Sequence, residues 1–327
     1  MNFFEFGAVE RLGKENKLLK LNQLIDWKRL DKHFKGLYKK DIEDKGGQRP
    51  YDPIKMFKAI LLGQWHSLSD PELEESLRVR LDFMLFTGFE LGEDLPDETT
   101  LCRFRNRLIA KGLDKPLFEA INRQLEKLGL KVKACDGAVV DATIVESASR
   151  PNRVLEPSAD GQTYELKESA DPDARWLKKG KHAYFGYRGY ARTDSDQGYI
   201  ESTHVKPANE AETKELAKAV EGSHAKRIYA DKGFASKANR EMLKNKGFAD
   251  GIMEKAVRGR KLSLWQKLKN KLISKKRFIV ERAFGTLKRQ LKMFRASYRT
   301  REKVEGQFRL KALCYNLLKA ANAVQIG

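Results

Sequence analysis

Apolar residues recur at helical spacing through the first 130 residues. Leucine, isoleucine and phenylalanine in residues 19–37 follow the period of a helix. A turn rich in Gly and Pro at 46–53 follows, and residues 53–66 then form a strongly apolar helical segment. Ser69 and Glu72 spell a capping box, which predicts the start of a further helix. The pattern therefore predicts short helices joined by short turns.

The last helix of this region is expected to begin at Asp97, a favourable N-cap residue. It carries Arg103, Arg105 and Arg107 close together. Short helices with arginines on the last one are similar to a helix-turn-helix unit that binds DNA. The alternative is a helical bundle that does not bind DNA and whose arginines are merely solvated.

The periodicity changes after about residue 133. Runs of β-branched and apolar residues predict a buried strand, a hairpin and two further strands, at 137–146, 182–194 with 198–205, 227–234 and 248–253. Capping residues and glycine stops predict helices between and after them, at 209–222, 236–247 and 276–294. Residues 147–181 have no apolar period and are expected to form an inserted loop. This order of elements is typical of an α/β domain.

The predicted organisation is a helical N-terminal domain in residues 1–130 followed by an α/β domain in residues 131–327. A length of 327 residues fits about two domains. Composition excludes membrane proteins, because no window reaches the ~20 apolar residues of a membrane-spanning helix. The N-terminus lacks the order of a signal peptide, and Cys102, Cys135 and Cys314 form no C-x-x-C pair. We expect a cytoplasmic, nucleoid-associated bacterial protein.

The net charge is +20, from 65 Lys and Arg against 45 Asp and Glu. Most of it is local, because residues 254–311 hold twenty Lys or Arg against four acids, a net charge of +16. A field of this size favours a polyanion partner, usually nucleic acid. The alternative, a solvated basic face, does not explain why Glu281 stands in the middle of the run. Histidines at metal-binding spacing, a phosphate-binding P-loop and a dinucleotide fingerprint are all absent.

Three acids stand in positions where chemistry is expected. Asp141 lies inside an apolar strand, Asp231 ends another, and Glu281 lies on the long helix within the basic run. Acids at strand ends and on an adjacent helix can converge, and three carboxylates offer the hard oxygen ligands that suit Mg²⁺. Two such ions would stabilise the attacking and leaving oxygens of a phosphoryl displacement.

Each acid also has a structural interpretation. Asp136 is a rival to the first acid, and Asp231 could cap the loop that follows its strand. Glu281 could form an ordinary helical ion pair with Arg277 or Arg282. The three contexts together favour the catalytic interpretation.

The segments VVDATIVES, YADKGF and RFIVERAFGTLKR resemble the catalytic segments of DDE transposases of bacterial insertion sequences. The phrase KKGKHAYFGYRGYARTDSDQGYI most resembles the insertion sequence five family, and the likeness extends over nearly the whole chain. The resemblance implies a ribonuclease-H-like catalytic domain with a mixed five-stranded sheet flanked by helices. It maps the three catalytic acids and metal ligands to Asp141, Asp231 and Glu281.

The wider group carries a Tyr, Arg, Glu, Lys signature around the third acid. Arg277, Glu281 and Lys288 fit its spacing, while Ser274 stands in place of the tyrosine. A basic insertion is expected at about 254–275, where Trp265 could stack on an unpaired base or anchor its own helix. The expected DNA contacts are Arg277, Lys288, Arg282, Arg289, Trp265, Arg103, Arg105 and Arg107.

These features predict a DNA transposase that binds terminal inverted repeats and cleaves the element ends by Mg²⁺-dependent phosphodiester hydrolysis. It would then join the 3′-OH ends to target DNA. Two Mg²⁺ ions, replaceable by Mn²⁺, are the expected cofactors, and double-stranded DNA is the expected partner of at least a homodimer. The alternatives are a ribonuclease-H-like nuclease or resolvase without strand transfer, and a DNA-binding regulator without catalysis.

Overall fold

The computed structural model describes the chain in segments, at residues 3–13, 15–38, 49–132, 135–151, 155–157, 164–166, 169–257 and 259–324. The chain divides into two compact units, one of Met1–Lys133 with Arg309–Gly327 and one of Ala134–Phe308. The sequence predicts a single C-terminal domain of residues 131–327. The last residues cluster with the helical unit because Arg309 forms an ion pair with Asp114, and Asn316 donates to Asn122 (2.9 Å).

The first unit is helical, as the apolar periodicity predicts. Its elements are α1 (Phe3–Leu12), α2 (Lys17–Leu24), a 3-10 helix (Trp27–His33), α3 (Pro53–His66), α4 (Asp70–Val79), α5 (Leu81–Thr87), α6 (Glu98–Ala110), α7 (Asp114–Lys127) and part of α11 (Arg301–Ala323). The capping box of Ser69 and Glu72 is present, and Asp97 accepts from the Thr100 amide (2.6 Å). The expected turn at 46–53 falls partly outside the described residues.

The single helix expected at 19–37 is instead two elements. Ile25 has an extended conformation, which ends α2 after Leu24. The Asp26 side chain then accepts from the Arg29 amide (3.3 Å) and caps the following 3-10 helix. A residue that caps a new helix interrupts the previous one, which periodicity alone does not reveal.

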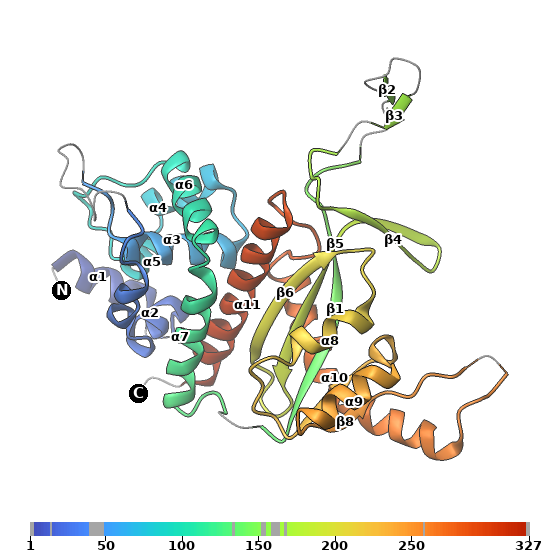
Figure 1. Cartoon of the computed structure of the whole chain (residues 1–327). Helices are drawn as coiled ribbons and strands as arrows, with labels where there is room; N and C mark the ends of the chain where they lie inside the picture. Colours follow the sequence, from blue (N-terminus) through green and yellow to red (C-terminus); the bar gives the residue numbers. More distant parts are fainter. Residues whose placement is uncertain are drawn as a thin grey trace. The chain divides into compact units, whose positions relative to one another are not determined.

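The second unit contains the expected mixed sheet, coloured green to yellow in Figure 1. Its central strand β1 (Gly137–Glu146) pairs antiparallel with β5 (His182–Asp194) and parallel with β7 (Arg227–Ala230). Strand β8 (Ala249–Ile252) pairs parallel with β7, and β6 (Ile200–Pro207) pairs antiparallel with β5. The five predicted strands are therefore all present.

Within the segment expected to be a loop, the structure has three further strands. Strand β4 (Arg175–Lys179) pairs antiparallel with the start of β5 and becomes the sixth strand of the sheet. Strands β2 (Leu155–Pro157) and β3 (Tyr164–Leu166) form a separate two-stranded sheet. Because β4 is short and mostly exposed, its sequence lacks the apolar alternation by which strands are usually recognised.

The helices of the second unit include α8 (Glu212–Ala219), α9 (Lys237–Asn245) and α10 (Leu264–Arg289), together with a 3-10 helix (Lys232–Phe234) and the start of α11. Helix α10 begins earlier than expected. The second half of the predicted basic insertion is therefore continuous with the helix that carries Glu281. A capping box between Ser263 and Gln266 fixes this start. No helix in the described part of the chain is long and apolar enough to cross a membrane.

A buried carboxylate fastens the sheet to the segments around it. Asp171 is fully buried and accepts hydrogen bonds from Ser147 (2.5 Å), from the Tyr187 hydroxyl and from the Thr300 amide (3.0 Å). These donors come from the end of β1, from β5 and from the residue before α11. A buried carboxylate with three donors is well satisfied, so it holds these segments in register.

In the helical unit, Lys58 of α3 is buried against aromatic rings. Its Nζ donates to Asn22 (3.0 Å) and lies 4.8 Å from the ring centre of Trp27 and 5.4 Å from that of Phe86. Burial lowers the pKa of Lys58 to about 8, although Asp52 partly opposes the shift. The folded protein therefore favours the neutral amine more than the unfolded chain does.

We expect Lys58 to make stability depend on pH. An unfolded lysine titrates near pH 10.4, so between about pH 8 and pH 10.4 the unfolded chain binds a proton that the folded chain does not. Stability therefore rises with pH across this window, by at most about 3 kcal/mol. Urea unfolding at pH 7 to 10 measures the free energy of unfolding of wild type and of Lys58→Met. The value for wild type should rise relative to that for Lys58→Met as the pH rises. Parallel pH profiles for the two proteins would contradict the shifted pKa.

Candidate active site

The first two acids lie side by side because of strand register. Val140 of β1 pairs with Ala230, the last residue of the parallel strand β7. The next residues along the two strands are Asp141 and Asp231. Neighbouring parallel strands run in the same direction, so these two carboxylates lie at the same level of the sheet. Acids 90 residues apart in the numbering are thus adjacent.

The third acid reaches the same place from α10. Arg277 lies one helical turn before Glu281, and its Nη2 is 2.7 Å from Asp141 Oδ2 and 3.8 Å from Glu281 Oε1. Its Nη1 is 3.3 Å from Asp231 Oδ1. The three predicted acids therefore converge on one guanidinium. Arg277, predicted to contact DNA phosphate, is here the shared partner of the carboxylates.

Burial decides how these charges behave. Burial raises the pKa of Asp141, and the nearby Arg277 only partly offsets it. Burial alone would lower the pKa of Arg277, but Asp141, followed by Asp231 and Glu281, raises it. The guanidinium therefore stays charged and neutralises much of the repulsion among the acids.

The donor set of this site fits a divalent cation. Three carboxylates provide hard oxygen ligands of the kind that Mg²⁺ and Mn²⁺ prefer. As the side chains lie, no three His, Cys, Asp or Glu of the described residues are arranged to hold a metal ion, since Arg277 stands between the acids. The Nε of Arg277 is buried without a hydrogen-bond partner. The guanidinium is therefore incompletely anchored, which suits a group that moves when another cation neutralises the acids.

The other predicted contacts on α10 differ in exposure. Lys288 is half-buried, and burial, followed by the charge of Lys179, lowers its pKa while Glu146 opposes the shift. Arg282 and Arg289 are exposed, the former 5.9 Å from the ring centre of Phe278.

Trp265 lies in the first turn of α10 and is 74% exposed. The anchor alternative would require this ring to be packed against its own unit. The described residues leave it open to solvent, so Trp265 stays a predicted DNA contact.

In the helical unit the three arginines of α6 are not equivalent. Arg105 is buried and forms a bidentate ion pair with Asp70, in which Nη2 is 2.9 Å from Oδ2. This pair ties α6 to α4, so its guanidinium is committed to the interior. Arg103 and Arg107 are exposed, the latter 5.7 Å from the ring centre of Tyr38. Only these two remain placed for the predicted contact with DNA.

Sequence reasoning missed a fourth acid beside the site. Glu212 of α8 forms an ion pair with Arg188 of β5 (3.2 Å). Burial raises the pKa of Glu212, Arg188 opposes the shift, and Asp141 and Asp231 raise it further. A Cβ at Gly233 would lie 1.9 Å from the Glu212 carboxylate, so a larger residue two positions after Asp231 would displace this side chain. The acidic start of the helix was visible in the sequence, but not its place in the fold.

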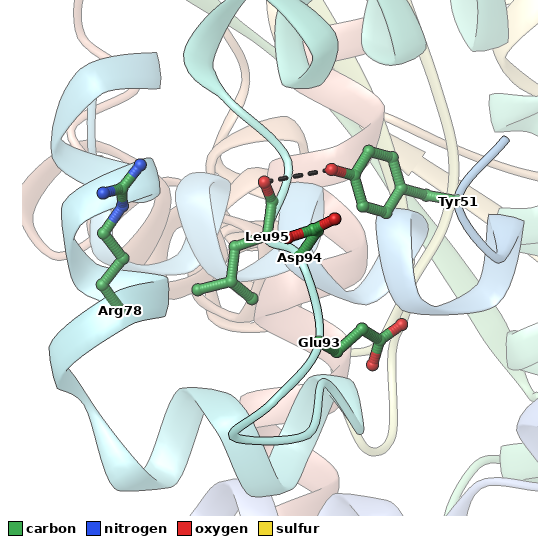
Figure 2. Close-up of a pocket in the computed structure, with 5 residues that line it drawn as sticks. All are labelled: Tyr51, Arg78, Glu93, Asp94 and Leu95. Atoms are coloured by element: carbon green, nitrogen blue, oxygen red, sulfur yellow. Dashed lines mark hydrogen bonds between the residues drawn. The ribbon is translucent and has the colours of Figure 1, made fainter. Parts of the chain in front are cut away.

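A separate pocket lies in the helical unit (Figure 2). It is lined by Tyr51, Arg78, Glu93, Asp94 and Leu95, and the Tyr51 hydroxyl donates to the Leu95 carbonyl (3.1 Å). Burial, followed by Asp94, raises the pKa of Tyr51. None of the three predicted catalytic acids lines this pocket, so it is separate from the carboxylate site.

Comparison with known proteins identifies the family of the chain. Residues 136–317 match the transposase DDE domain family, and residues 8–107 match the transposase domain DUF772. The chain belongs to the DDE transposases, which are metal-dependent enzymes. It is 45% identical over 223 residues to the transposase for insertion sequence element IS1106 of Neisseria meningitidis serogroup B, covering 67% of this chain and 77% of that protein.

Two solved structures are similar at a lower level. The piggyBac transposase synaptic complex with hairpin DNA matches with a TM-score of 0.46 and 12% identity, over 94% of this chain and 75% of that chain. The Mos1 mariner paired end complex with Mn matches with a TM-score of 0.20 and 13% identity, over 81% and 84%. The assignment rests on the family match and on the insertion-sequence relative.

Replacing Arg277 should expose the repulsion among the acids. Removing one partner of a buried ion pair leaves uncompensated charge, so Arg277→Met should lose about 2–4 kcal/mol of stability. Added Mg²⁺ should raise its Tm more than that of wild type, because the cation binds the acids that the guanidinium held. Thermal unfolding with and without Mg²⁺ measures both effects. Arg282→Met, on the exposed face of the same helix, is the control, and equal Mg²⁺ shifts in all three proteins would rule out a common cation site.

Proposed function

We propose that the chain catalyses cleavage of DNA at the ends of an insertion sequence and transfer of the freed 3′-OH ends to target DNA. The observation that carries this proposal is the convergence of Asp141, Asp231 and Glu281 on one cationic group. Similarity to the insertion-sequence relative supports DNA as the substrate. The phrase at residues 178–200 favours the insertion sequence five family.

The three acids are the proposed metal ligands. Asp141 and Asp231 are held at one level by strand register, and Glu281 is brought to them by α10. When bound, two Mg²⁺ ions, or Mn²⁺ in their place, supply Lewis-acid stabilisation of the oxygens in a phosphodiester displacement. The protein's part is to hold the carboxylates at fixed positions, so that little reorganisation is needed when DNA arrives.

The basic residues of α10 are the proposed phosphate ligands. Arg277 has a planar guanidinium that can turn from the acids to a phosphate and bind it through two parallel hydrogen bonds. Lys288 lies about three turns further along the same helix face. Arg282, Arg289 and Trp265 are exposed on the same helix, where they would contact the DNA on either side of the cleaved bond.

Recognition of the terminal repeats is assigned to the helical unit. Its exposed Arg103 and Arg107 lie on α6, the last helix of the helix-turn-helix-like region. Because two ends must be cut and joined together, we propose at least a dimer on DNA. The convergence of all three acids at one site argues against a DNA-binding regulator without catalysis.

Removing one catalytic carboxylate should abolish the chemistry and leave DNA binding intact. We expect Asp141→Asn, Asp231→Asn and Glu281→Gln each to cut element-end DNA at least about 10³-fold more slowly. Gel assays of duplexes carrying the terminal repeat, with Mg²⁺, measure the rate. Asp136→Asn is the matched control, because this exposed acid pairs with Lys226 and should retain wild-type cleavage. Cleavage by a folded Asp141→Asn protein at the wild-type rate would disprove the assignment.

Strand transfer distinguishes a transposase from a nuclease that only cuts. Supplied with pre-cut ends that carry a free 3′-OH, the protein should join them to a target plasmid. The joined product is detected by a change in plasmid mobility and by sequencing the junction. Cleavage of intact ends together with a complete failure to join pre-cut ends would instead favour the nuclease.

A further inference from the structure

Strand β4 and the first part of β5 form a two-stranded ribbon, residues 175–186, at the end of the sheet. Its pairing runs from Arg175 opposite Gly186 to Lys179 opposite His182, and a two-residue turn at Gly180 and Lys181 closes it. Gly180 has φ +62°, the left-handed conformation that such tight hairpin turns favour. The pairing of β1 with β5 ends at Gly186, so β1 does not extend along the ribbon.

The ribbon is strongly basic. Residues 175–186 read RWLKKGKHAYFG, with four Lys or Arg and no Asp or Glu. Lys178, Lys179 and Lys181 surround the turn, and all three are exposed. No acid among the described residues forms an ion pair with any of them. Three lysines gathered at one tip without acidic partners favour a polyanionic ligand.

An aromatic pair makes the ribbon stiff. Trp176 and Phe185 are directly opposite each other, and their ring centres lie 5.4 Å apart. Cross-strand aromatic pairs stabilise a two-stranded ribbon that would otherwise be marginal. The tip lysines are therefore presented on a fixed support.

The ribbon leads directly to the proposed active site. Along β5, Gly186 is five residues from Ala191, which pairs with Asp141, a separation of about 17 Å. At the other end, Lys179 is close enough to Lys288 to contribute to the lowered pKa of that amine. Two lysines held close together repel each other, and a phosphate between them would relieve this repulsion.

We propose that the β4–β5 ribbon is a DNA-binding element that holds the duplex next to the cleaved phosphate. The major groove of B-DNA is wide enough for a two-stranded ribbon, and the tip lysines would bind the phosphates along its edges. Double-stranded DNA is the occupant because the ribbon carries only positive charge and continues into the carboxylate site. This inference rests on the proposed function, which supplies the DNA substrate.

The test compares two triple variants that remove the same charge. The ribbon variant carries Lys178→Ala, Lys179→Ala and Lys181→Ala, and the control carries Lys237→Ala, Lys244→Ala and Lys246→Ala, which alter exposed lysines in and next to α9. Fluorescence anisotropy with a terminal-repeat duplex, in Ca²⁺, measures Kd from 50 to 300 mM KCl. Circular dichroism and Tm confirm that both variants fold.

Each phosphate contact contributes about 0.9 to the slope of log K against log salt. The ribbon variant should therefore have a slope smaller by about 2–3 and bind at least about tenfold more weakly at 150 mM KCl. The Kd of the control variant should stay within about threefold of the wild-type Kd. Hydroxyl-radical protection should be lost within about one turn of DNA, ~34 Å, from the cleaved phosphate. Equal slopes and footprints for the two variants would overturn the proposal.

The outcome for the ribbon can be separated from that for the catalytic proposal. If wild type cuts and joins DNA while the ribbon variant binds like the control, only the ribbon inference fails. A different outcome is that the ribbon variant shows the smaller salt slope and the lost hydroxyl-radical protection while Asp141→Asn still cuts at the wild-type rate. In that case the catalytic assignment fails and the ribbon inference is supported.

Discussion

The site depends on one guanidinium that three carboxylates share. Asp141, Asp231 and Glu281 come from a central strand, the end of its neighbour and a helix, and each would repel the others if Arg277 were absent. A planar group with several donors can reach three acids at once, which a lysine ammonium on a flexible stem does less well. Strand register places Asp141 beside Asp231, and helical spacing places Arg277 beside Glu281. The charge balance of the site therefore depends on both.

This arrangement relates stability to function. The interaction that holds the acids together in the protein alone is the one that would loosen, in the proposed function, when cations and phosphate enter. Buried charges are costly unless paired, and Arg277 pairs with all three acids. A second cluster surrounds Asp171, whose carboxylate accepts three hydrogen bonds and connects the ends of the strands that carry the site.

Much of this organisation could be predicted from the sequence. The alternation of β-branched residues predicted five strands, and acids inside or at the ends of such strands are unusual enough to notice. Strand β4 was missed because its pairing with β5 stabilises a sequence that has no apolar period of its own. The ion pairs of Arg277 and Arg105 could not be predicted from the sequence. Helical spacing shows which residues are neighbours on one helix, but not partners on other elements such as Asp141 or Asp70.

The early start of α10 has a mechanical consequence. Trp265 and Glu281 belong to one uninterrupted helix, and at 1.5 Å per residue they are separated by about 24 Å. A continuous helix of that length can act as a lever: a ligand that binds its exposed first turns would also change the angle at which Glu281 meets the other two acids. Occupation of a remote stretch of DNA could in this way be sensed at the cleaved bond, without any flexible part between them.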